Sequence, residues 1–446
     1  MASSRKSKKN PKTINRIAVA LSGGLDSVVL LDSVCKASNS DQTEIWVFHI
    51  HHGLQKAADE WILFCEKLAK KYKVHFDFRL LHLKNNQAQG NIEARARAGR
   101  YEALEDLCAE HNIHDLLLAH HQNDQAETIL LQLLRGSGIA GMAGMPQQRE
   151  LVKGKSITLW RPLLDQSRAQ LESYAKEHKL KWVEDPSNVD TSYRRNAIRK
   201  YILPKLVQIQ PEAVANLARS AQLMAQAQGL LDRLAEQDGQ AIFTQHELKV
   251  ASLKGLAKSD LPAANNVLRY WLKRHNLGMP SQERLQSWWS DLHSVKPSAQ
   301  LEWQHDGVSI RLWRGKLQVT NPNRQENTGE WVFKPISVRS KLPGISLDWV
   351  REAQGNRSIE LRKRSGAEKL QIKPGSPRKT LKNLFQELQV PPWERQAPLL
   401  YINGELIAVA GVGVSYPHLG LVGPRVWPQW LPQPEWSQTV AQNPVK

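Results

Sequence analysis

Short apolar runs alternate with amphipathic segments between Ile17 and about Lys205. Apolar runs bounded by polar residues are typical of buried strands, whereas apolar residues three and four apart are typical of helices. The expected strands are residues 17–21, 45–50, 74–83 and 116–119, and the expected helices between them are residues 57–72 and 92–110. This alternation predicts an α/β fold with a doubly wound, mainly parallel sheet, whose ligand site lies at the carboxyl ends of the strands.

Polar segments follow three of the predicted strands. They are residues 22–27, 49–53 and 120–124. Because the carboxyl ends of parallel strands meet at one edge of a sheet, we expect the three segments to converge on one crevice. The first domain that this pattern predicts covers residues 15–210, after a disordered basic tail at residues 1–14.

The pattern changes after Pro211. Apolar residues at helical spacing predict a long helix, and they are Leu217, Ala221, Met224, Leu231 and Leu234. Further helices are expected at 263–275 and 281–292, followed by a hairpin with strands at 299–304 and 308–312 and an Asp306-Gly307 turn. The sequence therefore predicts a mainly helical middle domain at residues 211–322, with a polar linker at 321–330.

A small mixed α+β domain is expected at residues 356–426. Its one clear helix is predicted to begin at Ser376, with Pro377 in the first turn. The apolar positions of this helix are Leu381, Leu384, Phe385 and Leu388. Beyond Val426 the Trp-, Pro- and Gln-rich tail is expected to be irregular.

The segment SGGLDS follows the first predicted strand and precedes a helix, so it forms a strand-to-helix turn. Its residues are Ser22, Gly23, Gly24, Leu25, Asp26 and Ser27. Glycines allow close backbone approach, and a helix N-terminus attracts anions, so the turn favours phosphate. Asp26 stands where a mononucleotide P-loop has a cation, which makes sense if Mg²⁺ lies between the acid and a polyphosphate. The alternative is a plain glycine-rich turn.

Three further segments carry residues suited to phosphate chemistry. Asp124 and Glu127 are three apart and share a helix face, although Asp124 alone could simply cap that helix. Arg97 and Arg100 share another face, where the alternative is a surface ion pair of Arg97 with Glu93. Arg195 belongs to a basic cluster at residues 194–200, for which composition alone does not decide between phosphate and solvent.

The charge balance points to a polyanionic partner. The chain of 446 residues has 61 Lys and Arg against 43 Asp and Glu, a formal net charge of +18. Nucleic acid is the first expectation, and a solvated basic surface is the alternative. The three cysteines form no CxxC pair, which excludes a disulfide scaffold and a Cys-rich metal site. No apolar run reaches the length of a membrane span, so we expect a cytoplasmic protein.

The motifs together resemble a known family. SGGLDS is similar to the PP-loop of ATP pyrophosphatases, which cleave ATP between the α and β phosphates. With EARARAGRY, AHHQNDQAETILLQLLRGSG, RPLL, EDPSN, YRRNAIRK and GSPRKTLKNLFQELQVPPWERQAPLLY, the chain resembles bacterial tRNA(Ile)-lysidine synthetases over nearly its whole length. The family often has a second acid where this chain has Asn123, so we place the acidic role on Asp124.

The resemblance implies a two-step reaction with ATP and Mg²⁺. The cytosine O2 of the wobble cytidine in an isoleucine tRNA with a CAU anticodon attacks the α-phosphate, and free L-lysine then attacks C2 and releases AMP. Residues 22–27 would hold the pyrophosphate, Asp26 and Asp124 would position Mg²⁺, and Arg97 and Arg195 would neutralise the phosphate. The base that deprotonates lysine stays open among His120, His121 and Glu127.

The C-terminal domain is expected to bind tRNA, as is the middle domain. Nine Lys and Arg stand against three acids between residues 357 and 387. Cations near the start of the predicted helix oppose its dipole, a cost that a phosphate partner would offset. The candidate tRNA contacts are Arg378, Lys379, Lys382 and Arg395, whereas Trp393 is expected to pack.

Two rival functions remain. One is another PP-loop enzyme, such as a tRNA thiolase or an amide synthetase, although paired cysteines for thiolation are absent. The other is a catalytically inactive RNA-binding protein of the same fold, although Asp26 and both glycines of the loop are retained. A homodimer is an option that the sequence leaves open.

Overall fold

The computed structural model describes residues 15–38, 43–51, 57–81, 92–151, 157–184, 190–295, 301–320 and 329–432. The predicted tail at 1–14, Gly53, the DPSN segment at 185–188 and most of the predicted linker lie outside these residues. The chain divides into two compact units, one of residues 1–240 with 261–272 and one of residues 241–260 with 273–446. Each unit is described by itself.

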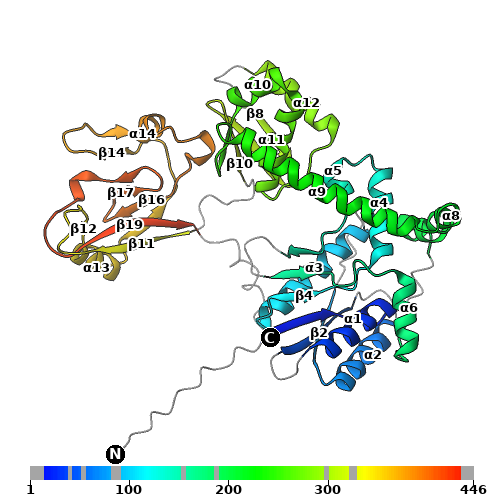
Figure 1. Ribbon diagram of the computed structural model, residues 1–446. Coiled ribbons are helices and arrows are strands. Elements are labelled where there is room, and N and C mark those ends of the chain that lie inside the picture. Colours follow the sequence, from blue (N-terminus) through cyan, green and yellow to red (C-terminus); the bar gives the residue numbers. More distant parts are fainter. Residues whose placement is uncertain are drawn as a thin grey trace, which may run out of the picture. The chain divides into compact units, whose positions relative to one another are not determined.

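A six-stranded sheet organises the first unit (Figure 1). Its order is β3 (His75–Leu80), β2 (Thr43–His51), β1 (Asn15–Ala20), β4 (Asp115–Leu117), β6 (Thr158–Trp160) and β5 (Gln148–Glu150). All neighbours are parallel except β5 and β6. The mainly parallel sheet is confirmed, with strand ends shifted by one to three residues. The strand order changes direction between β1 and β4. In open parallel sheets, ligands bind at such a switch point, beyond the carboxyl ends of the strands.

Helices cover both faces of this sheet, because alternate strand residues point to opposite faces. Val19 and Val47 pack on one face against α1 (Leu25–Ala37), α2 (Ala57–Tyr72) and α6 (Arg168–Glu177). Ala18 and Phe48 pack on the other face against Leu104 of α3 (Ile92–Glu110). The doubly wound arrangement is therefore confirmed, and the predicted bounds of α2 and α3 agree with the structure.

A helical layer adjoins the sheet at its carboxyl edge. It contains α4 (Gln122–Leu134), α5 (Ile139–Met142), α7 (Arg194–Ala197), the π-helix η2 (Ile198–Ile202), α8 (Leu203–Ile209) and the long helix α9 (Ala213–Gly239). Helix α11 (Leu261–Arg274) contacts α9 farther along, where Asn266 donates to the Leu231 carbonyl at 2.7 Å. Figure 1 shows the long helix α9 running beside α4, and Ala126 of α4 shares a small core with Ile198 and Leu203. The predicted long helix thus begins on the catalytic domain, and this packing fixes α4 and α7 beside one another.

The second unit begins with a small α+β segment. Its antiparallel sheet has the order β7 (Glu247–Lys249), β10 (Lys316–Thr320), β9 (Val308–Trp313), β8 (Leu301–His305), accompanied by α10 (Val250–Ser259) and α12 (Gln282–Ser294). The predicted Asp306-Gly307 turn is confirmed, with φ angles of 51° and 80°. Ser281 caps α12 by accepting a hydrogen bond from the Arg284 N–H at 3.2 Å.

The C-terminal part of this unit is mixed α+β, as expected. Its core contains Ile345, Val350, Ile402, Ile407 and Val426. Its elements are β11 (Gly329–Ile336), β12 (Ile345–Ser346), α13 (Leu347–Gly355), β13 (Ile359–Arg362), β14 (Lys369–Leu370), β15 (Lys379–Thr380), α14 (Leu381–Glu387), η3 (Pro392–Glu394), β16 (Leu399–Ile402), β17 (Glu405–Val409), β18 (Gly413–Val414), η4 (Tyr416–His418) and β19 (Arg425–Pro432).

Two expectations for this part are wrong. The segment after Val426 is not irregular up to Pro432, because β19 pairs with β11 along its whole length, and Gly329 and Glu330 of the predicted linker belong to β11. The prolines in β19 hid an alternation in which Val426 and Pro428 are buried and Trp427 is exposed.

The start of the C-terminal helix also differs from the prediction. Helix α14 begins after Thr380, whose hydroxyl accepts from the Asn383 N–H at 3.4 Å, because Lys379 and Thr380 are first used as strand β15. Ser376 lies in the preceding turn and donates to the Lys373 carbonyl at 2.9 Å. Leu381, Leu384 and Phe385 are buried as predicted, whereas Leu388 follows the helix and is exposed.

Candidate active site

The loop between β1 and α1 has the form that phosphate binding requires. Gly23 has a φ of 89°, and a Cβ there would lie 2.9 Å from Val183 Cγ2, so only glycine fits. Gly24 is the N-cap residue of α1 and has no side chain to occupy the free N–H groups of that helix end. Ser27 Oγ donates to the Gly24 carbonyl at 2.9 Å and lies 3.1 Å from Ser22 Oγ. The loop is therefore held in shape, and no side chain caps the start of α1, so the N–H groups of its first turn stay available to an anion.

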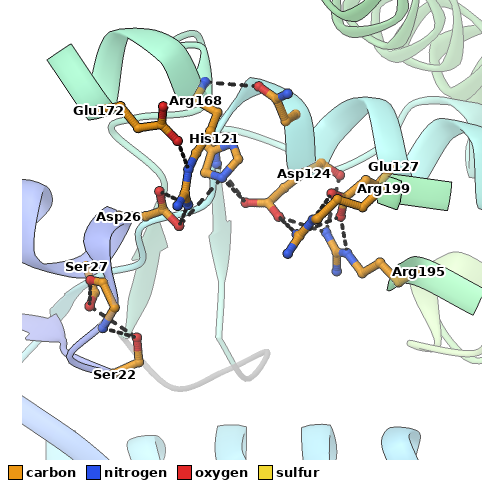
Figure 2. Close-up of polar contacts among 12 residues, drawn as sticks. Ser22, Asp26, Ser27, His121, Asp124, Glu127, Arg168, Glu172, Arg195 and Arg199 are labelled. Carbon is orange, nitrogen blue, oxygen red and sulfur yellow. Dashed lines mark hydrogen bonds and ion pairs between the residues drawn. The ribbon is translucent and has the colours of Figure 1, made fainter. Parts of the chain in front are cut away.

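The ends of β1 and β4 meet at one histidine. His121 Nε2 lies 3.6 Å from Asp26 Oδ2 and 3.5 Å from Asp124 Oδ2, and Figure 2 shows the imidazole between the two carboxylates. His49, at the end of β2, bonds through Nδ1 to the Leu21 carbonyl at 2.8 Å. The predicted convergence of three strand ends is thus present for the residues that the structure describes.

Asp124 and Glu127 share one face of α4 and are both held by arginines. Glu127 is fully buried and receives Arg195 Nε and Arg199 Nε, each at 2.6 Å (Figure 2). Arg195 Nη2 also donates to Asp124 Oδ1 at 3.2 Å. Burial raises the pKa of Asp124, but His121 and Arg195 outweigh it and hold that pKa below its usual range. The basic cluster at 194–200 therefore pairs with acids at this site instead of facing solvent alone.

Asp124 also caps the start of α4, the simpler role that the sequence suggested. Asp124 Oδ2 accepts a hydrogen bond from the His121 backbone N–H at 3.1 Å, which satisfies one free donor at the start of α4. One carboxylate oxygen is thus used for capping, and the other faces Arg195. Capping and a chemical role are compatible, because each oxygen of a carboxylate has two lone pairs.

Sequence reasoning gave no role to Arg168, which the structure places on Asp26. Arg168 Nη1 lies 2.8 Å from both Asp26 oxygens, and its Nε donates to Glu172 Oε1 at 3.0 Å. Its backbone N–H donates to Asn123 Oδ1 at 3.0 Å, so the unusual Asn123 holds the start of α6. The capping-box pattern of Ser167 and Gln170 could have predicted this helix, but no local signal shows that its first residue reaches Asp26.

His120 follows β4 and contacts Arg161, which belongs to a second group of cations. Burial lowers the pKa of His120 to about 3, with Asp124 acting in the opposite direction and Arg161 adding to the lowering. Its Nδ1 accepts a hydrogen bond from Arg161 Nε at 3.3 Å. A group with so low a pKa is a very weak base, so His120 is a poor candidate for deprotonating lysine.

Arg97 is found apart from the acids. Its guanidinium carbon lies 5.7 Å from the centre of the Tyr101 ring, and that of Arg149 lies 5.3 Å from the same ring. No contact joins Arg97 to Asp26 or Asp124 within the residues that the structure describes. The side chain of Glu93, the other partner considered for Arg97, lies outside them. The predicted action of Arg97 on the phosphate thus stays a prediction.

The four candidate tRNA contacts fall into two kinds. Arg378 and Lys382 are exposed. Lys379 pairs with Glu387 at 2.7 Å, and Arg395 Nε donates to the Val390 carbonyl at 2.9 Å. The cations do not all crowd the start of α14, so the argument from its dipole holds only for Lys382 within the helix. Trp393 packs edge-on to Trp313 at 6.2 Å, as expected.

The fold and the site define a class of protein. A glycine loop at a helix N-terminus, an adjacent acid and a switch point in a parallel sheet are the parts of a PP-loop domain, and a family model described as "PP-loop domain" matches residues 1–206. Models described as "TilS substrate binding domain" and "TilS substrate C-terminal domain" match residues 252–318 and 359–420. None of the helices in the described ranges combines the length and the apolar character of a membrane span.

Curated relatives identify the family. The tRNA(Ile)-lysidine synthases of Burkholderia pseudomallei and Nitrosomonas europaea are each 36% identical to this chain. The alignments cover 93% of both chains for the first, and 90% of this chain with 88% of the relative for the second. The enzyme of the same name from Coxiella burnetii is 34% identical over 89% of both chains. The chain belongs to the tRNA(Ile)-lysidine synthase family.

Proposed function

We propose that this protein is an ATP-dependent ligase that converts the wobble cytidine of a CAU-anticodon isoleucine tRNA into lysidine with free L-lysine. The observation that carries the proposal is the meeting of Asp26 and Asp124 at His121, beside an anion-binding loop, in a chain of this family. The cytosine O2 displaces pyrophosphate from the α-phosphate of ATP, and the lysine amine then displaces AMP from C2.

The loop of residues 22–27 is suited to hold the departing pyrophosphate. The free N–H groups at the start of α1 and the dipole of this 13-residue helix favour negative charge where the β and γ phosphates would lie. The loop itself contains no lysine or arginine. Its contribution is therefore directional hydrogen bonding, and balancing charge has to come from elsewhere in the site.

Mg²⁺ fits the donor chemistry of the two acids. Hard carboxylate oxygens are preferred ligands, and Asp26 and Asp124 present oxygens that lie within 3.6 Å of the same imidazole nitrogen. Bound there, the ion would supply charge neutralisation for the phosphates. Both acids pair with arginines in this structure, so Arg168 and Arg195 compete for the same oxygens.

Arg195 is placed to neutralise charge on the reacting phosphate. Glu127 fixes its Nε at 2.6 Å, which leaves the Nη2 edge directed toward Asp124. A guanidinium that is already oriented loses little conformational entropy when it meets a transition state. Glu127 is thereby a positioning residue, and both of its oxygens are engaged, so it is not available as a base.

Of the three candidates for the base that deprotonates lysine, we favour His121. His120 is a very weak base and Glu127 is fully paired, whereas His121 Nε2 faces Asp26 and Asp124 and its Nδ1 is buried without a described partner.

The middle domain at 211–322 and the C-terminal domain at 356–426 are proposed to bind the tRNA. Residues 329–432 contain fifteen Lys and Arg against eight Asp and Glu, a balance that favours a phosphate backbone. Because the substrates are tRNA and ATP, the cytoplasm is the expected compartment.

Incorporation of labelled lysine tests the proposal. Unmodified isoleucine tRNA with a CAU anticodon, ATP and Mg²⁺ are supplied to the native protein, to Asp26→Asn and to a surface control, Lys176→Gln, an exposed lysine on α6. We expect label in the RNA and release of AMP with the native protein and the control only. ATP cleavage without lysine transfer would point to another acceptor, and no ATP turnover at all would point to an RNA-binding protein without this activity.

A further inference from the structure

A cluster of three guanidiniums lies around Tyr101, and one of them, Arg161, contacts His120. Arg97 and Tyr101 come from α3, Arg149 comes from β5, and Arg161 follows β6 directly. Hydrogen bonds from Arg149 and Arg161 reach the Tyr101 side chain, and the guanidinium carbons of Arg97 and Arg149 lie 5.7 and 5.3 Å from its ring centre. We call these four residues the Tyr101 cluster.

The positive charge of the Tyr101 cluster is not balanced by acids. Arg161 is only 2% exposed and donates to the Pro146 carbonyl at 2.6 Å and to His120. Arg149 donates to the carbonyls of Glu150 and Leu151, at 3.2 and 3.4 Å. Within the part of the chain that the structure describes, no carboxylate pairs with Arg97, Arg149 or Arg161. Converging cations without counter-charge are costly unless an anion completes them.

The chemistry of Tyr101 reports the same excess of charge. Burial raises the pKa of its phenol, but the charges of Arg97, Arg161 and Arg149 outweigh burial and shift that pKa downward. The three guanidiniums thus already favour negative charge at this point. An incoming oxyanion would meet guanidinium donors in the fork geometry that suits carboxylates.

His120 connects this cluster with the acidic group along the chain. Its Nδ1 accepts from Arg161 Nε at 3.3 Å, the next residue, His121, faces Asp26 and Asp124, and burial keeps the His120 ring neutral. A substrate that lies across His120 therefore finds cations at one end and Asp124 with His121 at the other. Free lysine has a matching form, since its α-carboxylate is separated from its ε-amine by a flexible aliphatic chain.

We propose that the Tyr101 cluster binds the α-carboxylate of the free lysine substrate, with the ε-amine directed past His120 toward His121. This inference rests on the proposed ligase function and adds the subsite that selects an amino acid over a simple amine. It assigns Arg97 to lysine instead of to the α-phosphate of ATP. The deep burial of Arg161 favours a small anion over the backbone of a tRNA.

The test compares lysine with cadaverine, the same diamine without a carboxylate. Transfer of each amine to adenylated tRNA is measured for the native protein, Arg149→Gln, Arg149→Lys and the surface control Lys176→Gln. Arg149 is chosen because it is half-buried, so its loss disturbs packing less than loss of Arg161. Loss of a charge-assisted contact should raise KM for lysine about ten- to a hundredfold in Arg149→Gln. KM for cadaverine, and release of pyrophosphate before amine is added, should change less than about twofold.

The outcomes separate this inference from the proposed function. A higher KM for tRNA with an unchanged KM for lysine would overturn it in favour of an RNA phosphate, and slower pyrophosphate release would overturn it in favour of ATP. Equal losses for lysine and cadaverine would reduce the Tyr101 cluster to a structural role. Failure of the native protein to transfer lysine at all would instead remove the proposed function.

Discussion

Replacement of Glu127 by Gln removes the charge that positions two arginines while keeping the side-chain volume. Glu127 is fully buried and receives three hydrogen bonds, from Arg195 at 2.6 Å and from Arg199 at 2.6 and 3.1 Å. Breaking a fully buried ion pair costs about 3–5 kcal/mol. The side chains of Arg195 and Arg199 are 22% and 44% exposed, so water compensates part of that loss. We therefore expect a loss of about 1–3 kcal/mol in the free energy of unfolding.

The variant should also lose activity, because Arg195 is no longer held toward the crevice. A loss of about 1.4 kcal/mol of transition-state stabilisation is tenfold in rate, so pyrophosphate release should fall at least about tenfold. Thermal unfolding and pyrophosphate release are measured beside Glu177→Gln, an exposed glutamate on α6. If Glu127→Gln unfolds and reacts like that control, Glu127 does not position Arg195 and the argument fails.

Three further outcomes are expected. Gly23→Ala should destabilise the protein by about 1–3 kcal/mol and weaken ATP binding in a nucleotide titration, because of the positive φ and the close Val183, while Gly229→Ala should do neither. Asp32→Asn should destabilise the protein at neutral pH. Burial raises the pKa of Asp32, but hydrogen bonds from Lys36 and two tyrosines hold it below its ordinary 3.8, so the ionised carboxylate stabilises the fold above about pH 4 and this stabilisation is lost as pH falls through the lower, folded-state pKa. Unfolding curves of both proteins across pH measure this difference. Arg168→Ala should free Asp26 and lower the Mn²⁺ concentration for half-saturation in a metal-binding titration; an unchanged value would show that Arg168 does not compete for this acid.

The parallel sheet could be predicted because buried strands carry continuous apolar runs, and because the helices that connect them have apolar residues at regular three- and four-residue spacing. The runs at Ile17 and Ile45 pair in register in β1 and β2, and the helices of residues 57–72 and 92–110 have the expected bounds. Strand β19 was missed because Pro and Trp replace the β-branched residues that mark a strand. Its stability comes from pairing with β11, which lies about a hundred residues away and leaves no local trace.

The residues of the phosphate loop could be predicted because glycine, serine and acid at fixed spacing have a local physical reason. The partner of Asp26 could not be predicted, because Arg168 lies 142 positions away in the sequence. The capping box around Arg168 predicts only the start of a helix, not what its side chain contacts. Asn123 shows the same limit. In the sequence it is notable only because the family often has an acid at this position, whereas the amide oxygen of Asn123 accepts from the Arg168 backbone and thus helps to aim that arginine.

The charges at the crevice constrain how ATP can enter. Asp26, Asp124 and Glu127 are met by Arg168, Arg195 and Arg199, so this group has no net positive charge left for a polyphosphate. The loop offers dipoles but no cation, so either a metal ion arrives with the nucleotide or an arginine exchanges a carboxylate for a phosphate. Arg168 and Arg199 are 40% and 44% exposed and can move, whereas Arg195 is only 22% exposed and has less room to leave its two acids. Exchange by Arg168 would uncover Asp26 at the same moment, so a metal ion and a phosphate would be accepted together.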